Sequence, residues 1–63
     1  MKLELTFNGV SQTIGENVDF DLALEWAENH GAAHDWSDNY DYTLTDSNGQ
    51  VYVIACGAWF ERV

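Results

Sequence analysis

The chain begins with alternating apolar and polar side chains, a pattern typical of a strand with one buried face. The alternation runs through LELTF, and Asn8-Gly9, the pair favoured in type I′ turns, follows at once. A two-residue loop would set three pairs opposite each other: Phe7 with Val10, Leu5 with Gln12, and Leu3 with Ile14. The apolar members of these pairs would then share the buried face of a hairpin.

A second pattern, with apolar residues three and four positions apart, predicts a helix over residues 20–30. Asp19 or Asn17 can cap its start, and Gly31 can supply the left-handed residue that ends it. The apolar stripe consists of Phe20, Ala23, Leu24 and Ala27, widened by Leu22 and Trp26. The opposite side carries three mutually repelling acids: Asp21, Glu25 and Glu28.

A third segment predicts a second hairpin, because YDYTLTD and QVYVIACG flank the turn formers Ser47-Asn48-Gly49. Closing the turn with residues 48–49 or with residues 46–49 gives the same assignment of faces. One face would carry Tyr42, Leu44, Val51, Val53 and Ala55, and the other Thr43, Thr45, Tyr52 and Ile54. Trp59 and Phe60 would lie in a last strand or a C-terminal turn.

Together these elements predict a single α+β domain over residues 1–63, in the order ββαββ. Two hairpins would form a small antiparallel sheet with one helix packed on one face. A chain of 63 residues buries only about 60% of its unfolded surface, so its core is thin. Hydrophobic residues nevertheless make up 46% of the chain and aromatic residues 14%, too many for a disordered acidic segment.

The charge is strongly one-sided, with eleven acids against two bases and a net charge of −9. The bases are Lys2 and Arg62, and no Lys or Arg lies between them. Such a chain repels phosphate, which disfavours direct binding to nucleic acid or to an anionic membrane. The expected partner is a basic nucleic-acid-binding protein, with the chain itself a monomer or homodimer. Without a signal-peptide pattern or a transmembrane run, a reducing cytoplasm is the expected location.

The stretch HDWSDNYDY, residues 34–42, combines acids at every third position with aromatic residues. Carboxylates at such intervals can present a phosphate-like field to a protein that grips nucleic acid. The aromatics Trp36, Tyr40 and Tyr42 could stack on arginines or enter pockets that normally accept bases. The predicted partner-binding residues are Asp35, Asp38, Asp41, Trp36 and Tyr40, with the helix acids Asp21, Glu25 and Glu28.

Catalytic and metal-binding constellations are weak in this sequence. His30 and His34 have the four-residue spacing of helical metal ligands, but Gly31 is expected to end the helix between them. Cys56 lies in the apolar run VYVIACGAWF, where a buried and unactivated thiol is expected.

A calcium loop also fits only in part. Counting from Asp35 to Asp46 places oxygen side chains at the ligand offsets of an EF-hand, yet Tyr40 occupies the glycine position and Asp46 the glutamate position. We therefore expect neither an enzyme nor a cofactor or metal.

In length, charge and aromatic content the chain resembles the small acidic proteins with which bacteriophages block host DNA-handling enzymes. Among these, uracil-DNA glycosylase inhibitors carry a Glu-Ser-Ile element in an early strand. The early strand of this chain reads VSQTIG and lacks that element. The resemblance implies a phage-type host-defence antagonist that mimics nucleic acid. It would bind a nuclease, restriction, repair, CRISPR or polymerase component stoichiometrically. The alternative is a structural or accessory module that interacts through its Trp59-Phe60 end or an open sheet edge, with an acidic surface that serves solubility.

Overall fold

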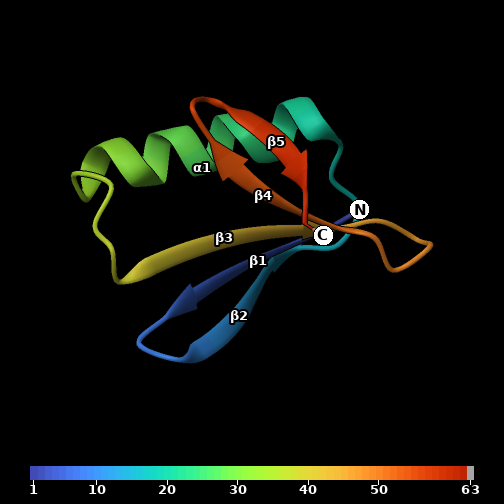
Figure 1. Cartoon of the computed structure of the whole chain (residues 1–63), viewed down its shortest axis with the longest axis horizontal. Helices are drawn as coiled ribbons and strands as arrows, with labels where there is room; N and C mark the ends of the chain where they lie inside the picture. Colours follow the sequence, from blue (N-terminus) through green and yellow to red (C-terminus); the bar gives the residue numbers. More distant parts are fainter. Residues whose placement is uncertain (63) are drawn as a thin grey trace.

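The computed structural model describes residues 1–62 as a five-stranded antiparallel sheet crossed on one face by a single helix (Figure 1). The elements are β1 (Lys2–Phe7), β2 (Val10–Gly15), α1 (Phe20–Ala33), β3 (Tyr40–Thr45), β4 (Val51–Ala55) and β5 (Ala58–Glu61). Their order in the sheet is β2-β1-β3-β4-β5. The α+β class is confirmed, but the predicted ββαββ order misses a strand, because the segment around Trp59 forms β5. No helix in the described residues has the length and apolarity needed to cross a membrane.

The first hairpin turns at Asn8-Gly9 as predicted. Both residues have positive φ, 52° and 81°, as a type I′ turn requires. The pairing begins in the expected register but shifts between Leu3 and Glu4, so that Leu3 lies opposite Gly15 rather than Ile14. Such a bulge adds one residue to β2. Ile14 still packs against the core.

Helix α1 starts where the sequence predicts and ends later. Asp19 is its N-cap, and its Oδ1 accepts a hydrogen bond of 2.7 Å from the backbone N–H of Leu22. The prediction that Gly31 ends the helix is wrong, because the helix runs through Gly31 to Ala33. Gly31 instead serves close packing. A Cβ at this position would lie only 2.5 Å from the ring of Trp36.

The core lies where the helix approaches the sheet most closely. Ala23, Ala27 and Gly31, the small residues of one helix face, are the buried residues of α1. They pack over four buried side chains of β1 and β3: Leu3, Leu5, Tyr42 and Leu44. Phe20 and Leu22, which the helical pattern assigns to the buried stripe, are instead exposed.

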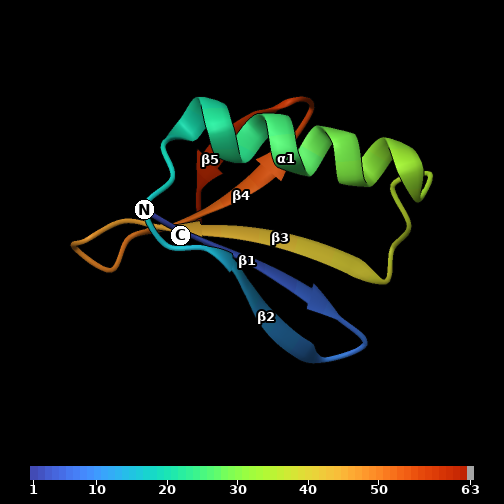
Figure 2. The ribbon, with the colours of Figure 1, turned by 180° about the vertical axis from the view of Figure 1, so that it is seen from behind.

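The helix does not cover the whole sheet. It packs on β1, β3 and β5, whereas the turn end of the β1–β2 hairpin extends away from it (Figure 2). Phe7 and Val10 were predicted to be buried, but both are exposed, Val10 to 71%. Both side chains lie on the face of the sheet that carries the helix, but in a part of that face that the helix does not cover.

In the second hairpin, the side chains of β4 point to the opposite faces of the sheet from those predicted. Its loop is the five residues 46–50, closed by the Asp46 carboxylate, which accepts hydrogen bonds from the backbone N–H groups of Asn48 and Gln50, each of 2.9 Å. An odd loop length reverses the faces of the following strand. Tyr52 therefore pairs with Leu44, so the predicted faces of β4 are wrong.

A tight turn at Cys56-Gly57 leads from β4 into β5, with φ values of 52° and 77°. Cys56 is exposed at this turn, so the prediction of a buried thiol is wrong. Trp59 of β5 donates a hydrogen bond from Nε1 to the carbonyl oxygen of Phe20, at 3.2 Å. This bond ties the β4–β5 hairpin to the start of α1.

Gly31→Ala should destabilise the protein, although alanine has the higher helix propensity. The added Cβ would overlap the Trp36 ring, and overpacking costs about 1–3 kcal/mol against a propensity gain of about 1 kcal/mol. Urea unfolding should show a net loss in the free energy of unfolding. Tryptophan fluorescence should report a displaced ring.

In a Trp36→Ala background the overlap is absent, so Gly31→Ala should instead stabilise the protein by about 1 kcal/mol. Asn29→Ala, at an exposed position of the same helix, controls for propensity alone. An equal loss of stability in both backgrounds would contradict the packing argument.

Candidate protein-binding surface

The three acids of the HDWSDNYDY stretch lie at the end of α1 and the start of β3. Asp35 and Asp38 are in the connection between these elements, Asp41 is in β3, and all three are exposed. Tyr42, the next residue in β3, is buried beneath the helix. Because successive side chains of a strand point to opposite faces, Asp41 projects from the face of the sheet that the helix leaves open.

Trp36 is held in a defined position next to these acids. It and Asp35 have positive φ values of 50° and 54°, and such a conformation costs roughly 1–3 kcal/mol for a residue other than glycine. The Trp36 N–H donates a 2.7 Å hydrogen bond to the carbonyl oxygen of Gly31. The ring packs against Gly31 and lies edge-on to Tyr42, with the ring centroids 6.0 Å apart. Trp36 nevertheless remains 48% exposed and can contact a partner.

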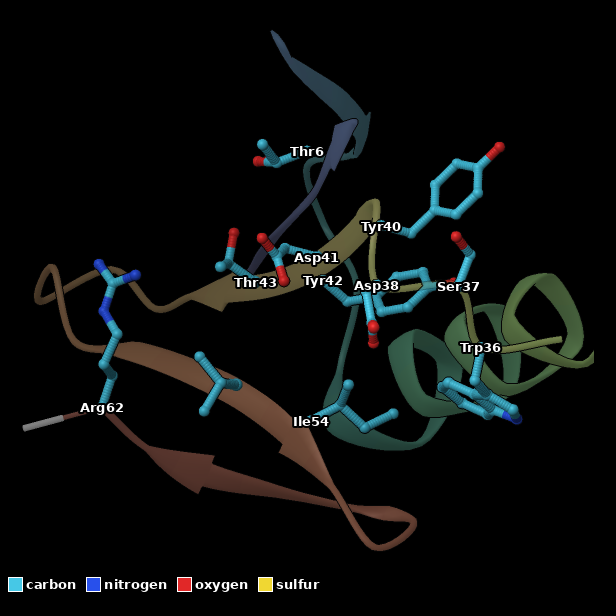
Figure 3. A pocket seen from close by; sticks show the side chains of 11 residues that line it. Thr6, Trp36, Ser37, Asp38, Tyr40, Asp41, Tyr42, Thr43, Ile54 and Arg62 are labelled. Carbon is cyan, nitrogen blue, oxygen red and sulfur yellow. The ribbon is translucent and has the colours of Figure 1, made fainter. Parts of the chain in front are cut away.

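A hollow of about 520 Å³ opens beside Trp36, where β4 separates from β3. The pairing of these strands stops at Thr43 and Val53, and β4 then continues with β5. The hollow combines two carboxylates, a guanidinium, an indole and a hydroxyl: Asp38, Asp41, Arg62, Trp36 and Thr43. Figure 3 shows Arg62 on one side, Trp36 on the other, and the carboxylates between them.

Sequence reasoning missed the contribution of Arg62 and Thr43 to this hollow. The two residues are far apart along the chain, and only the register of β3 with β4 brings them together. The alternation in YDYTLTD does place Thr43 on the same face as Asp41, but it carries no signal for the place where the two strands separate.

The predicted binding residues do not form one continuous surface. Asp21 and Glu25 are exposed on the side of α1 that faces away from its buried alanines, whereas Glu28 is exposed on the flank of the helix and lines a second hollow together with Trp36. The sheet therefore separates Asp21 and Glu25 from Asp41.

The tyrosines of the stretch also differ from the prediction. Tyr40 is half-buried and stacks on Phe7, with ring centroids 4.6 Å apart. Tyr42 is only 5% exposed. It belongs to the core and is not available to stack on a partner's arginine.

The acids receive little compensation from within the chain. Among residues 1–62, the one ion pair joins Lys2 Nζ to Glu4 Oε1 at 3.4 Å. Asp35, Asp38 and Asp41 form no ion pair with any described residue. Their charge is therefore available to a basic partner.

The two histidines lie together, in contrast to the sequence-based expectation. Because α1 continues through Gly31, His30 and His34 are one turn apart, with ring centroids at 4.3 Å. His30 Nδ1 forms a 2.8 Å hydrogen bond with the hydroxyl of Tyr42. Burial, followed by the charge of His34, lowers the pKa of His30, and burial raises the pKa of Tyr42.

The candidate calcium loop is divided between different structures. Its second half lies in β3, and Asp46 is engaged in closing the turn after that strand. Within the described part of the chain, no three residues among His, Cys, Asp and Glu converge as a metal-binding group.

Comparison of the chain with protein-family models, curated proteins and solved structures finds no match. Its function is therefore inferred from the chemistry and geometry of its own residues.

Acidification should weaken the contribution of His30 to stability. Because the folded protein lowers the pKa of His30, the unfolded chain binds this proton more tightly, with a pKa of about 6.5. The contribution of neutral His30 is thus present above about pH 6.5 and is lost as the pH falls from there toward the folded pKa.

Urea unfolding of the wild type and His30→Gln, at about pH 7.5 and about pH 5.5, measures this effect. Glutamine does not titrate, so the stability advantage of the wild type should shrink at the lower pH. Comparing the wild type with the variant at the same pH cancels the change in overall charge repulsion, because both proteins carry the same acids. An advantage that stays constant or grows at the lower pH would contradict the assignment.

Proposed function

We propose that the protein is a phage-type acidic inhibitor that acts without catalysis in the cytoplasm. It would occupy the basic nucleic-acid-binding surface of a DNA- or RNA-handling protein, in place of nucleic acid. The observation that carries this proposal is the acidic–aromatic surface, defined here as Asp35, Trp36, Asp38 and Asp41. Its carboxylates are exposed and without ion-pair partners among the described residues, and its indole is held in place beside them.

The hollow next to this surface suits a basic side chain. An arginine from the partner could pair with the Asp38 or Asp41 carboxylate and lie against the Trp36 ring, combining a charge-assisted hydrogen bond with a cation–π contact. Arg62 of the chain itself lines the same hollow. A guanidinium from a partner would enter the same hollow, in which Arg62 forms no ion pair with Asp38 or Asp41.

The strongest observation for a different function is the distribution of the acids. Asp41 and the acids of α1 lie on opposite sides of the sheet, an arrangement that suits a charged coat that maintains solubility. An accessory interaction module would then use apolar surface such as Phe60, which is 53% exposed, and the free edge of β5. Its binding would depend little on salt, and Trp59→Ala would impair it more than charge reversal.

Reversal of Asp35, Asp38 and Asp41 to lysine should weaken binding by roughly 100-fold, at about 1 kcal/mol for each charge contact. The matched control reverses Asp21, Glu25 and Glu28 of α1, which changes the net charge equally. Tagged wild type and both variants are used to capture proteins from bacterial lysate, with stepwise elution by salt and mass spectrometry. The purified target then serves for affinity measurements and for competition with nucleic acid.

The proposal requires one nucleic-acid-handling protein that binds the wild type and the helix variant, is lost with the 35–41 variant, and is displaced by nucleic acid. Equal losses in both triple variants would show that net charge alone matters. Retention by the 35–41 variant with loss in the helix variant would move the contact to α1. In both of these cases the proposed surface is wrong.

A further inference from the structure

The continuation of α1 through Gly31 places two imidazoles on one face of the helix. His30 and His34 are one turn apart, and their ring centroids lie 4.3 Å from each other with the planes tilted by 36°. For both rings to bind one ion through nitrogen bonds of about 2.0–2.1 Å, the His34 ring must turn out of this tilted stack until both ring planes contain the ion. The four-residue separation of the pair on one helix face is that of helical two-histidine metal sites.

The surroundings of His30 prepare one nitrogen for a metal ion. Nδ1 lies 2.8 Å from the Tyr42 hydroxyl, and in the tautomer in which Nδ1–H donates to this oxygen, Nε2 has a free lone pair for a metal ion. Histidine ligands commonly use their second nitrogen in this way, because the outer hydrogen bond sets the tautomer and the ring orientation. Trp26 stacks on His30 at 4.9 Å and Tyr40 packs edge-on at 4.8 Å, so the ring is held from several sides.

His34 provides the adjustable ligand. It is exposed at the C-terminal end of α1, where its ring can turn without disturbing buried side chains. Both imidazoles would bind a metal ion in their neutral form. The net charge of −9 further favours the approach of a cation.

We propose that His30 and His34 form a two-imidazole site for a borderline divalent transition metal ion, with water completing the coordination. Imidazole ligands favour Cu²⁺, followed by Ni²⁺ and Zn²⁺, over the hard ions Mg²⁺ and Ca²⁺. Among the described residues no third His, Cys, Asp or Glu joins the pair. The site therefore differs from a closed, four-ligand structural zinc site. This inference departs from the sequence-based expectation of no metal, and it is independent of the proposed partner.

Titration of the purified protein with CuCl₂ near neutral pH tests the site. Cys56 is exposed and would react with Cu²⁺, so the protein carries Cys56→Ser throughout. Cu²⁺ should quench tryptophan fluorescence saturably, because Trp26 stacks on His30. Calorimetry should give one ion per chain, and electron paramagnetic resonance should show two nitrogen ligands.

His34→Ala should lower the Cu²⁺ affinity at least ten-fold while the thermal unfolding of the metal-free protein stays close to that of the parent, since His34 is exposed. Asn29→Ala, exposed on the same helix, is the matched control and should bind as the parent does. The absence of saturable quenching would overturn the proposal. So would unchanged affinity in His34→Ala, or a resonance spectrum with fewer than two nitrogen ligands.

Discussion

The close approach of α1 to the sheet is the contact on which the rest of the structure depends. Ala23, Ala27 and Gly31 present almost no side-chain volume, so the helix can lie directly over Leu3 and Leu44, both almost completely buried. Burying one such leucine contributes about 1.5–3 kcal/mol, a large share of what a domain of this size can supply. A larger side chain anywhere along this seam would lift the helix and expose the core.

The same contact positions the acidic–aromatic surface. Gly31 leaves room for the Trp36 ring and accepts the hydrogen bond from its backbone N–H, so the left-handed turn at the end of the helix is held by packing. The β4–β5 hairpin is held to the helix by the bond from Trp59 to Phe20. Because that hairpin continues away from β3 beyond Thr43, the hollow beside Trp36 remains open.

Charge opposes this small fold. With a net charge of −9 and one ion pair among the described residues, the acids repel one another, and the thin core must offset that repulsion. A basic partner or a bound cation would relieve the repulsion in addition to making direct contacts. The acids lie on both sides of the sheet. A partner that neutralises the acids on one side therefore leaves those on the other side exposed to solvent.

The sequence by itself determined the local features: the Asn8-Gly9 turn, the Asp19 cap, the α+β class and the exposure of Asp35, Asp38 and Asp41. Each depends on neighbouring residues, whose preferences are readable from the chain. Only the tertiary structure decided the role of Gly31, because the choice between ending a helix and packing under a tryptophan depends on where Trp36 returns. The faces to which the side chains of β4 point likewise depended on the turn formed by Asp46, since one additional loop residue exchanges the two faces of the following strand. The hollow and the histidine pair follow from these long-range choices, and local sequence patterns do not contain them.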